Sequence, residues 1–295
     1  MMIWNTKITR ITKTKYPLVM AAFAGFGKTE FAAAFSNAGG LGIITSLNYK
    51  LDDFKLELKK MKELTNNPFG INLTMLPPGV RFISGSITKE DYLKYIEVAL
   101  NEGVNIFTTS AYQATYLGEK IKEFGGHWFH KCALLRHAIS AEKAGADAIT
   151  LIGMEAAGFK NPYQHTTLVN LTMANKLLKV PIIAAGGIGD ARGFLGALTM
   201  GAEAVCFGTA ILTTQESPIS TEVKKKWLET DIFTEEYHQR LYHRELKGTS
   251  VPSAAIGLQK DIIPLKTFIE NTMNDAEGIL KSLGFSKNEF STITN

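Results

Sequence analysis

Two short pairs of residues, Gly186-Gly187 and Gly208-Thr209, are the first candidates for chemistry because each directly follows an apolar run. The runs, at residues 181–185 and 204–207, are short and continuously apolar, which is typical of parallel strands buried on both faces. Glycines at the carboxyl ends of neighbouring parallel strands let backbone N–H groups approach an anion, and the next helix adds its positive N-terminal end. The pattern therefore predicts a phosphate-binding cup, although tight turns between a strand and a helix would also need such glycines.

Apolar runs alternate with helical patterns along the chain, which predicts eight strands. The pairs Gly186-Gly187 and Gly208-Thr209 follow the last two of these strands. Helices are predicted from apolar residues at helical spacing, for example over residues 51–64, 92–101 and 135–144. The predicted strands cover residues 18–22, 42–45, 69–73, 105–108, 128–132, 148–152, 181–185 and 204–207. This alternation favours an α/β fold, a parallel (β/α)8 TIM barrel, in which phosphate sites commonly follow strands 7 and 8.

The alternation stops after residue 213, where a charge-rich stretch begins. We expect a barrel over residues 1–213, an insertion or lid over 214–255, and a segment over 256–295 that packs back on the barrel. A long helix is predicted within that last segment, at residues 262–283.

Composition permits one large domain, because 45% of the 295 residues are hydrophobic and 20% are charged. The net charge of +4 comes from interspersed residues, so no nucleic-acid partner is expected. Cys132 and Cys206 both fall in predicted strands, which indicates buried thiols and a reducing, cytoplasmic environment. No apolar run is long enough for a signal peptide or a membrane span, and we expect neither a membrane partner nor a metal site.

Residues 22–29 match a relaxed P-loop, which gives a competing interpretation. A P-loop would use Lys28 on the nucleotide phosphates and Thr29 on Mg²⁺. An NTPase also needs an apolar strand that ends in an acidic metal-binding residue, and none of the later predicted strands clearly does. A P-loop NTPase and a sugar-phosphate barrel enzyme therefore stay open as remote alternatives.

Six segments, in order, resemble the nitronate monooxygenase family, formerly called 2-nitropropane dioxygenases. They are PLVMAAFAG, AAAFSNAGGLGII, PFGINL, AGADAITLIGMEAAG, PIIAAGGIGDARG and MGAEAVCFGTAIL, and the resemblance covers residues 17–217. It implies an FMN-dependent (β/α)8 barrel that acts on a small molecule. The family includes enoyl-ACP reductase II-like enzymes and some NAD(P)H:quinone reductases, so the resemblance leaves the reaction open.

The resemblance also implies the residues that would hold FMN. Lys131, at the end of the fifth predicted strand, matches a basic position near the pyrimidine edge, where a cation would stabilise the negative charge of the reduced ring. The cofactor-binding positions implied by the resemblance are Ala21, Ala22, Asn72, Lys131, Gly158, Gly186, Gly187, Gly208 and Thr209.

One position departs from the family pattern, because Phe159 stands where the family carries a histidine thought to move a proton. Phenylalanine cannot do this, so Phe159 is interpreted as an apolar wall for the substrate. His165, six positions later, is the candidate replacement acid or base, although a loop histidine is often only solvated or a helix cap. Glu155 is interpreted as orienting the loop by accepting backbone hydrogen bonds.

These observations favour an enzyme that oxidises alkyl nitronates with O2. The alternative is an NAD(P)H-dependent flavin reductase that acts on a quinone or an enoyl thioester, and a flavin-binding protein without a substrate also stays open. NAD(P)H and a second copy of the chain remain open as partners.

Overall fold

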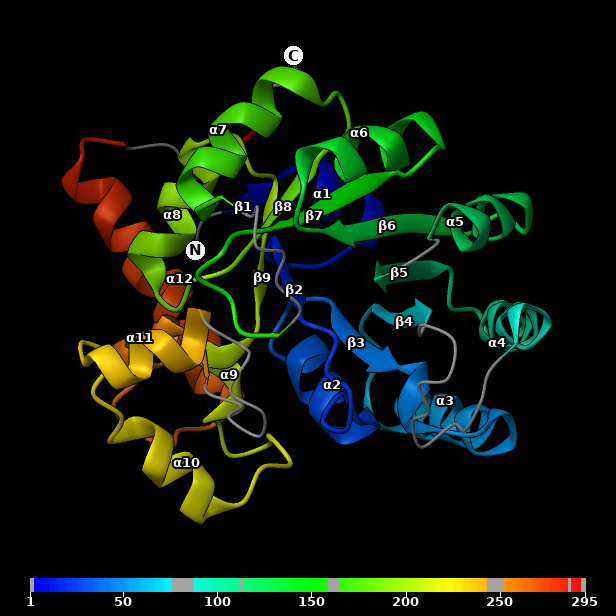
Figure 1. Ribbon diagram of the computed structural model, residues 1–295, viewed down its shortest axis with the longest axis horizontal. Helices are drawn as coiled ribbons and strands as arrows, with labels where there is room; N and C mark the ends of the chain where they lie inside the picture. The colour runs from blue at the N-terminus through cyan, green and yellow to red at the C-terminus, as the bar shows by residue number, and fades with distance from the viewer. Residues whose placement is uncertain are drawn as a thin grey trace.

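The computed structural model describes residues 3–75, 88–111, 114–158, 165–242, 252–285 and 288–292. Its centre is a sheet of eight parallel strands in the order β2-β9-β8-β7-β6-β5-β4-β3, surrounded by helices (Figure 1). A bridge between Val19 and Leu41 links the first and last strands, so the sheet forms a nearly closed barrel. The predicted (β/α)8 barrel is therefore confirmed.

All eight predicted strands are present, with small differences at their ends. Their bounds are β2 Leu18–Met20, β3 Gly42–Thr45, β4 Phe69–Met75, β5 Ile106–Ala111, β6 His127–Cys132, β7 Ala148–Ile152, β8 Ile182–Ala185 and β9 Ala204–Phe207. β4 and β5 extend beyond the predicted ends because their pairing continues as far as Met75 and Ala111. β2 ends before Ala21 and Ala22, which lie just past its carboxyl end.

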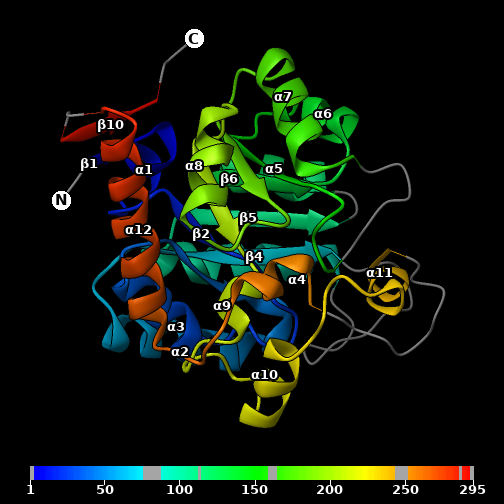
Figure 2. The same ribbon diagram turned by 90° about the vertical axis from the view of Figure 1, so that its left-hand side faces the viewer.

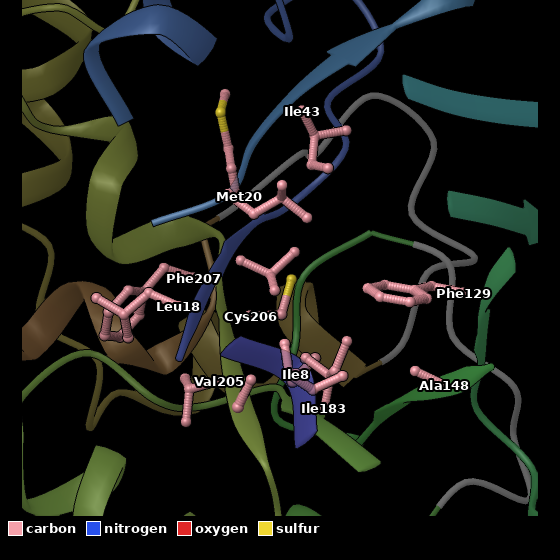
Figure 3. Packing of buried hydrophobic residues seen from close by; sticks show 14 of the residues in the cluster. Ile8, Leu18, Met20, Ile43, Phe129, Ala148, Ile183, Val205, Cys206 and Phe207 are labelled. Carbon is pink, nitrogen blue, oxygen red and sulfur yellow. The ribbon is translucent and has the colours of Figure 1, made fainter. Parts of the chain in front are cut away.

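A helix follows each strand, as the alternation predicts. These helices are α2 Thr29–Asn37, the 3₁₀ turn η1 Ser46–Asn48 with α3 Leu51–Leu64, α4 Lys89–Asn101, α5 Ala114–Glu123, α6 Leu135–Lys143, α7 Thr167–Leu177, α8 Ala191–Thr199 and α9 Thr209–Leu212. Buried apolar side chains fill the barrel and the layer between strands and helices. Figure 3 shows Phe129, Ala148, Ile183 and Cys206, from four different strands, packed in this core.

The two ends of the described chain meet outside the barrel, which the sequence did not predict. β1 (Ile3–Asn5) pairs with β10 (Glu289–Ser291) in a small parallel sheet. α1 (Lys7–Thr12) follows β1, and the backbone N–H of Lys7 donates to the buried carboxylate of Glu203, 2.7 Å away and just before β9. This contact places α1 at the amino-terminal end of the strands, away from the glycine pairs.

The chain after the barrel contains α10 (Thr221–Leu228), α11 (Glu235–Tyr242), the 3₁₀ turn η2 (Ala254–Leu258) and α12 (Leu265–Ser282). α12 packs against α2 and α8 along the outside of the barrel (Figure 2). It begins three residues later than predicted, because Pro264 disfavours helical backbone in the residue before it. The ammonium of buried Lys224 donates to the carbonyls of Gln215 and Ser217, which holds α10 to the chain that leaves the barrel.

A buried histidine in the layer between strands and helices makes stability depend on pH. His130 of β6 is 6% exposed, and its Nδ1 lies 3.0 Å from Thr109 Oγ1. Burial, with a smaller effect from the charge of His137, lowers the pKa of His130 to about 4. The unfolded chain, with a histidine pKa of about 6.5, takes up this proton first, so the free energy of unfolding falls as pH drops from 6.5 towards 4.

We expect His130→Gln to remove this pH dependence, since glutamine can still hydrogen-bond with Thr109 but does not titrate. Between pH 7 and pH 5 the wild type should lose about 2 kcal/mol more unfolding free energy than the variant. Urea unfolding at both pH values measures the difference. His238→Gln, which removes an exposed histidine, is the matched control and should keep the wild-type pH dependence. Equal slopes for wild type and His130→Gln would contradict the prediction.

Candidate active site

The two glycine pairs predicted from the sequence lie on adjacent strands. β8 and β9 pair in register with Ala185 opposite Cys206, so Gly186-Gly187 and Gly208-Thr209 emerge side by side at the carboxyl ends. Among the described residues, no acceptor pairs with the backbone N–H groups of Gly187, Gly208 or Thr209. Three free donors at the ends of two strands form a cup suited to an anion.

The glycines of the cup differ in what surrounds them. Gly186 and Gly187 have φ values of 105° and 72°, a region that disfavours other residues. A Cβ at Gly187 would lie 3.0 Å from Glu155 Cβ. A Cβ at Gly208 would meet only Ala21 Cβ, at 3.6 Å. Local packing therefore requires glycine at 186 and 187, whereas the open side of Gly208 leaves room for a ligand.

Glu155 braces the loop after β7, as the sequence analysis predicted. Its carboxylate accepts from the backbone N–H of Thr167, at 2.9 and 3.0 Å, and from the Thr167 hydroxyl, at 3.0 Å. The same hydroxyl lies 2.9 Å from the carbonyl oxygen of Gly186. The carboxylate thus caps the first turn of α7 and ties the β7–α7 loop to the cup.

A distant segment completes the cup, and sequence reasoning missed its role. The backbone N–H of Ser253 donates to Thr209 Oγ1 at 3.0 Å, and Gln259 Nε2 donates to the carbonyl of Gly189 at 2.9 Å. Since the Thr209 hydroxyl accepts this bond, its own proton stays available to donate to an anion. The only indication in the sequence was a weak resemblance of residues 253–265, SAAIGLQKDIIPL, to the same family.

Lys131 lies on the inner face of the barrel. It stands in register with Ser110 and Thr150, is half-buried, and makes no hydrogen bond or ion pair with the residues that the structure describes. Burial raises the pKa of the Cys206 thiol to about 11, and the charge of Lys131 opposes that rise. The lysine therefore places an unpaired positive charge near β9, on the side of the cup.

Asn72 also lies on the inner face, but its side-chain amide is hydrogen-bonded to residues of β4 and β5. Its Nδ2 donates to Thr108 Oγ1 at 3.0 Å, and its Oδ1 accepts from Thr74 Oγ1 at 2.7 Å. The side chain is 1% exposed. Contact between Asn72 and a cofactor stays a prediction.

The other residues expected on the β7–α7 loop are either exposed or outside the described part of the chain. Gly158 is exposed, with a φ of 90°, and Phe159 lies outside the described residues. His165 is exposed and lines a cavity beside the β6–α6 connection. Its carbonyl accepts from the backbone N–H of Met154 at 2.9 Å. The acid or base role of His165 remains a prediction.

The P-loop-like segment has a structural role in this fold. Thr29 is fully buried, and its backbone N–H donates to the Tyr49 hydroxyl at 3.3 Å, so it cannot present its side chain to a hydrated Mg²⁺ ion. Asn48 braces the preceding loop by accepting from the backbone N–H of Gly25 at 2.6 Å. Lys28-Thr29 therefore only begins a helix, and the NTPase interpretation is wrong.

Within the described ranges, no helix is both long and apolar enough to cross a membrane.

The fold and the cup define a (β/α)8-barrel protein whose strand ends present backbone donors without a described acceptor. The family model described as nitronate monooxygenase matches residues 5–249. The chain therefore belongs to the nitronate monooxygenase family, which is a family of oxidoreductases.

Individual relatives agree with this assignment. A probable nitronate monooxygenase of Staphylococcus saprophyticus is 29% identical over 250 residues, covering 73% of this chain and 70% of the relative. A Mycobacterium tuberculosis (3aS,4S,5R,7aS)-5-hydroxy-7a-methyl-1-oxo-octahydro-1H-indene-4-carboxyl-CoA dehydrogenase is 29% identical over 229 residues. That match covers 77% of this chain but only 61% of the mycobacterial protein.

Solved structures share the fold over nearly the whole chain. FabK from Thermotoga maritima superposes with a TM-score of 0.81 at 26% identity, covering 95% of this chain and 98% of FabK. A nitroalkane oxidase from Streptomyces ansochromogenes has a TM-score of 0.76 at 19% identity, covering 94% of this chain and 99% of the oxidase, which supports the fold alone.

Proposed function

We propose that the protein is an FMN-dependent oxidoreductase that oxidises alkyl nitronates with O2. The single observation that carries the proposal is the cup at Gly187, Gly208 and Thr209, whose backbone N–H groups have no acceptor among the described residues. An anionic phosphate group suits three backbone donors at the ends of neighbouring strands better than a neutral ligand does. Membership of the nitronate monooxygenase family supports the choice of reaction.

The residues present suit FMN. Gly187, Gly208 and Thr209 would hold the phosphate, and the small side chains of Ala21 and Ala22, just past β2, leave room for a flat ring. FMN supplies the two-electron chemistry when it is bound. We propose FMN rather than FAD because, apart from the P-loop-like segment with its structural role, the sequence supplies no second nucleotide site.

Lys131 would stabilise negative charge on the reduced cofactor. Its ammonium has no partner among the described residues and is half-buried, so less water screens it than on the surface. The same charge favours an anionic substrate such as a nitronate near the barrel mouth.

The proposal is tested by releasing the cofactor with denaturant and identifying it by mass, followed by turnover of propyl-2-nitronate with O2. We expect FMN and measurable oxygen uptake. Recovery of FAD, or of no flavin after reconstitution with FMN, would contradict the cofactor assignment. Bound FMN without nitronate turnover would contradict the reaction.

A second candidate is an NAD(P)H-dependent reductase of a quinone or an enoyl thioester. The likeness to FabK and the mycobacterial relative named as a carboxyl-CoA dehydrogenase favour it. NAD(P)H oxidation with such an acceptor, together with no turnover of nitronates, would select this alternative.

We also propose that residues 214–255 act as a lid, of which residues 243–251 lie outside the described part of the chain. α11 of this segment ends at Tyr242, and burial together with the charge of Glu155 raises the pKa of Tyr242. The hydrogen bond from the backbone N–H of Ser253 to Thr209 Oγ1, 3.0 Å long, supports a position for the end of this segment beside the cup. Cytoplasmic location and homo-oligomerisation stay predictions, and light scattering on the purified protein tests the second.

We expect Lys131→Met to lower the reduction potential of the bound flavin by tens of millivolts, because an unpaired positive charge is removed from a poorly hydrated site. Potentiometric titration with redox dyes measures the shift. Lys131→Arg keeps the charge and should stay near the wild-type value, and Lys143→Met is the control for an α6 lysine away from the barrel interior. An unchanged potential in Lys131→Met would place the lysine away from the flavin.

A further inference from the structure

A row of polar side chains crosses the inner face of the barrel near the carboxyl ends of four strands. β4, β5, β6 and β7 are neighbours in the sheet (Figure 1). Trp128 of β6 packs towards α5 outside the sheet, so Lys131, three residues later, faces the interior. Residues paired in register share a face of the sheet. Register pairing therefore places four side chains in one polar row: Thr74, Ser110, Lys131 and Thr150.

A chain of hydrogen bonds fixes the direction in which the hydroxyl groups of this row donate. Asn72 Nδ2 lies 3.3 Å from the carbonyl oxygen of Thr108, which can only accept, so this end of the amide is the donor. Asn72 Oδ1 is the opposite end, and it accepts from Thr74 Oγ1 at 2.7 Å. The hydroxyl of Thr74 has one proton, and this bond uses it.

The hydroxyl of Ser110 must then donate to Thr74. The two side-chain oxygens lie 2.6 Å apart, and a hydrogen bond between them needs one proton. Since the proton of Thr74 goes to Asn72, the proton in this bond comes from Ser110. Ser110 Oγ keeps free lone pairs but has no proton left to donate. The hydrogen-bond chain therefore ends, beside Lys131, in an oxygen that can only accept.

Ser110 and Lys131 together present an acceptor and a donor on neighbouring strands. Both side chains are half-buried, and Lys131 makes no hydrogen bond or ion pair with the described residues. A lysine ammonium can only donate, so a matching ligand carries an acceptor next to a donor. The pyrimidine edge of a flavin has this order, with the C2 carbonyl oxygen beside the N3–H group.

The polar row lies across the barrel from the phosphate cup. β5 is four strands away from β9 in the ring of eight strands, so Ser110 and Gly208 stand on opposite sides of the opening. A ligand held by its phosphate at Gly208 must extend over the opening to reach Ser110. FMN suits this arrangement, because a ribityl chain separates its phosphate from its ring.

We infer that Ser110 accepts a hydrogen bond from the N3–H group of the flavin, while Lys131 contacts the adjacent C2 carbonyl. The inference rests on the proposed FMN-dependent function and adds a cofactor contact that the sequence analysis did not predict. Asn72, which was expected to face the cofactor, acts through Thr74 and Ser110 as a positioning residue. All donors in the chain from N3 to Asn72 point the same way, which strengthens each hydrogen bond.

The test compares FMN with 3-methyl-FMN, in which a methyl group replaces the N3 proton. Quenching of flavin fluorescence measures the dissociation constant of each flavin from the apoprotein without turnover. We expect the wild type to bind FMN about 10-fold or more tightly than 3-methyl-FMN, the loss typical of an acceptor left without its donor. Ser110→Ala should reduce this preference to about twofold or less.

Thr74→Val separates the hydrogen bond from the bulk of the added methyl group. Valine has nearly the shape of threonine, so the space beside Ser110 is kept, but the Ser110 hydroxyl loses its acceptor and can turn to other partners. The preference for FMN should therefore fall by about threefold or more. A preference due to bulk alone would stay at the wild-type value.

Two further variants serve as controls. Lys131→Met removes the partner of the C2 carbonyl, which both flavins carry, so it should weaken both equally and keep the preference. Ser140→Ala removes an exposed serine from α6 and should bind both flavins like the wild type. Melting temperatures establish that each variant folds.

Three outcomes would overturn the inference while leaving the cofactor assignment intact, because FMN itself would still bind. These are equal affinity of the wild type for the two flavins, the full wild-type preference in Ser110→Ala or in Thr74→Val, and an equal loss of preference in Ser140→Ala. A wild-type protein that binds neither flavin would contradict both the cofactor assignment and the inference.

Discussion

The Gly208→Ala variant should fold normally but fail to retain FMN through purification. A Cβ at this position meets no protein atom closer than Ala21 Cβ at 3.6 Å, so the barrel itself accommodates it. The same methyl group would stand beside the free N–H groups of Gly208 and Thr209, where the phosphate is proposed to approach. We expect FMN affinity to fall at least 100-fold, measured by fluorescence quenching during reconstitution of the apoprotein.

Two other glycine variants separate ligand exclusion from damage to the fold. Gly187→Val should lose FMN and also stability, by about 1–3 kcal/mol, because its φ of 72° is unfavourable for a β-branched residue and Glu155 lies behind it. Gly196→Ala, in α8 with no heavy atom within 4 Å of the added Cβ, should bind FMN like the wild type. Wild-type flavin content in Gly208→Ala would remove the phosphate assignment.

The wild-type enzyme is expected to turn over nitronates far better than the corresponding neutral nitroalkanes. A nitronate is already deprotonated, whereas a neutral nitroalkane must first lose a carbon-bound proton. General-base catalysis typically speeds such a step by about 10² to 10⁴, and the sequence resemblance predicts that Phe159 replaces the histidine with which the family would move this proton. We expect kcat/KM for 2-nitropropane to be lower than for its nitronate by a factor in this range, measured by oxygen uptake directly after dilution of pre-ionised substrate.

The same assay decides whether His165 serves as the general base in place of the family histidine. If it does, His165→Ala should abolish the residual activity on the neutral substrate and flatten its pH profile, while nitronate turnover is unchanged. Phe159→His should raise activity on the neutral form selectively. Efficient turnover of neutral 2-nitropropane that survives His165→Ala would contradict the prediction and place the base elsewhere.

Local sequence patterns determined the barrel and the two glycine pairs of its candidate site. Buried parallel strands and amphipathic helices each leave a short-range signature, so all eight strands could be predicted within a few residues. Because successive strands of a βα unit are neighbours, the pairs Gly186-Gly187 and Gly208-Thr209 could be placed together without a structure. The residue type also indicated the backbone conformation of the first pair, because φ is positive at Gly186 and Gly187 and glycine favours such values.

Only the tertiary structure decided which distant residues complete the site. Ser253 lies 44 positions from Thr209, and Gln259 lies 70 positions from Gly189, yet each pair is joined by a hydrogen bond. Such contacts depend on the paths of loops, which have no periodic pattern for the sequence to reveal. The cavity beside the β6–α6 connection has the same origin, because Arg136 and Asn170 line it from helices that follow different strands, α6 and α7.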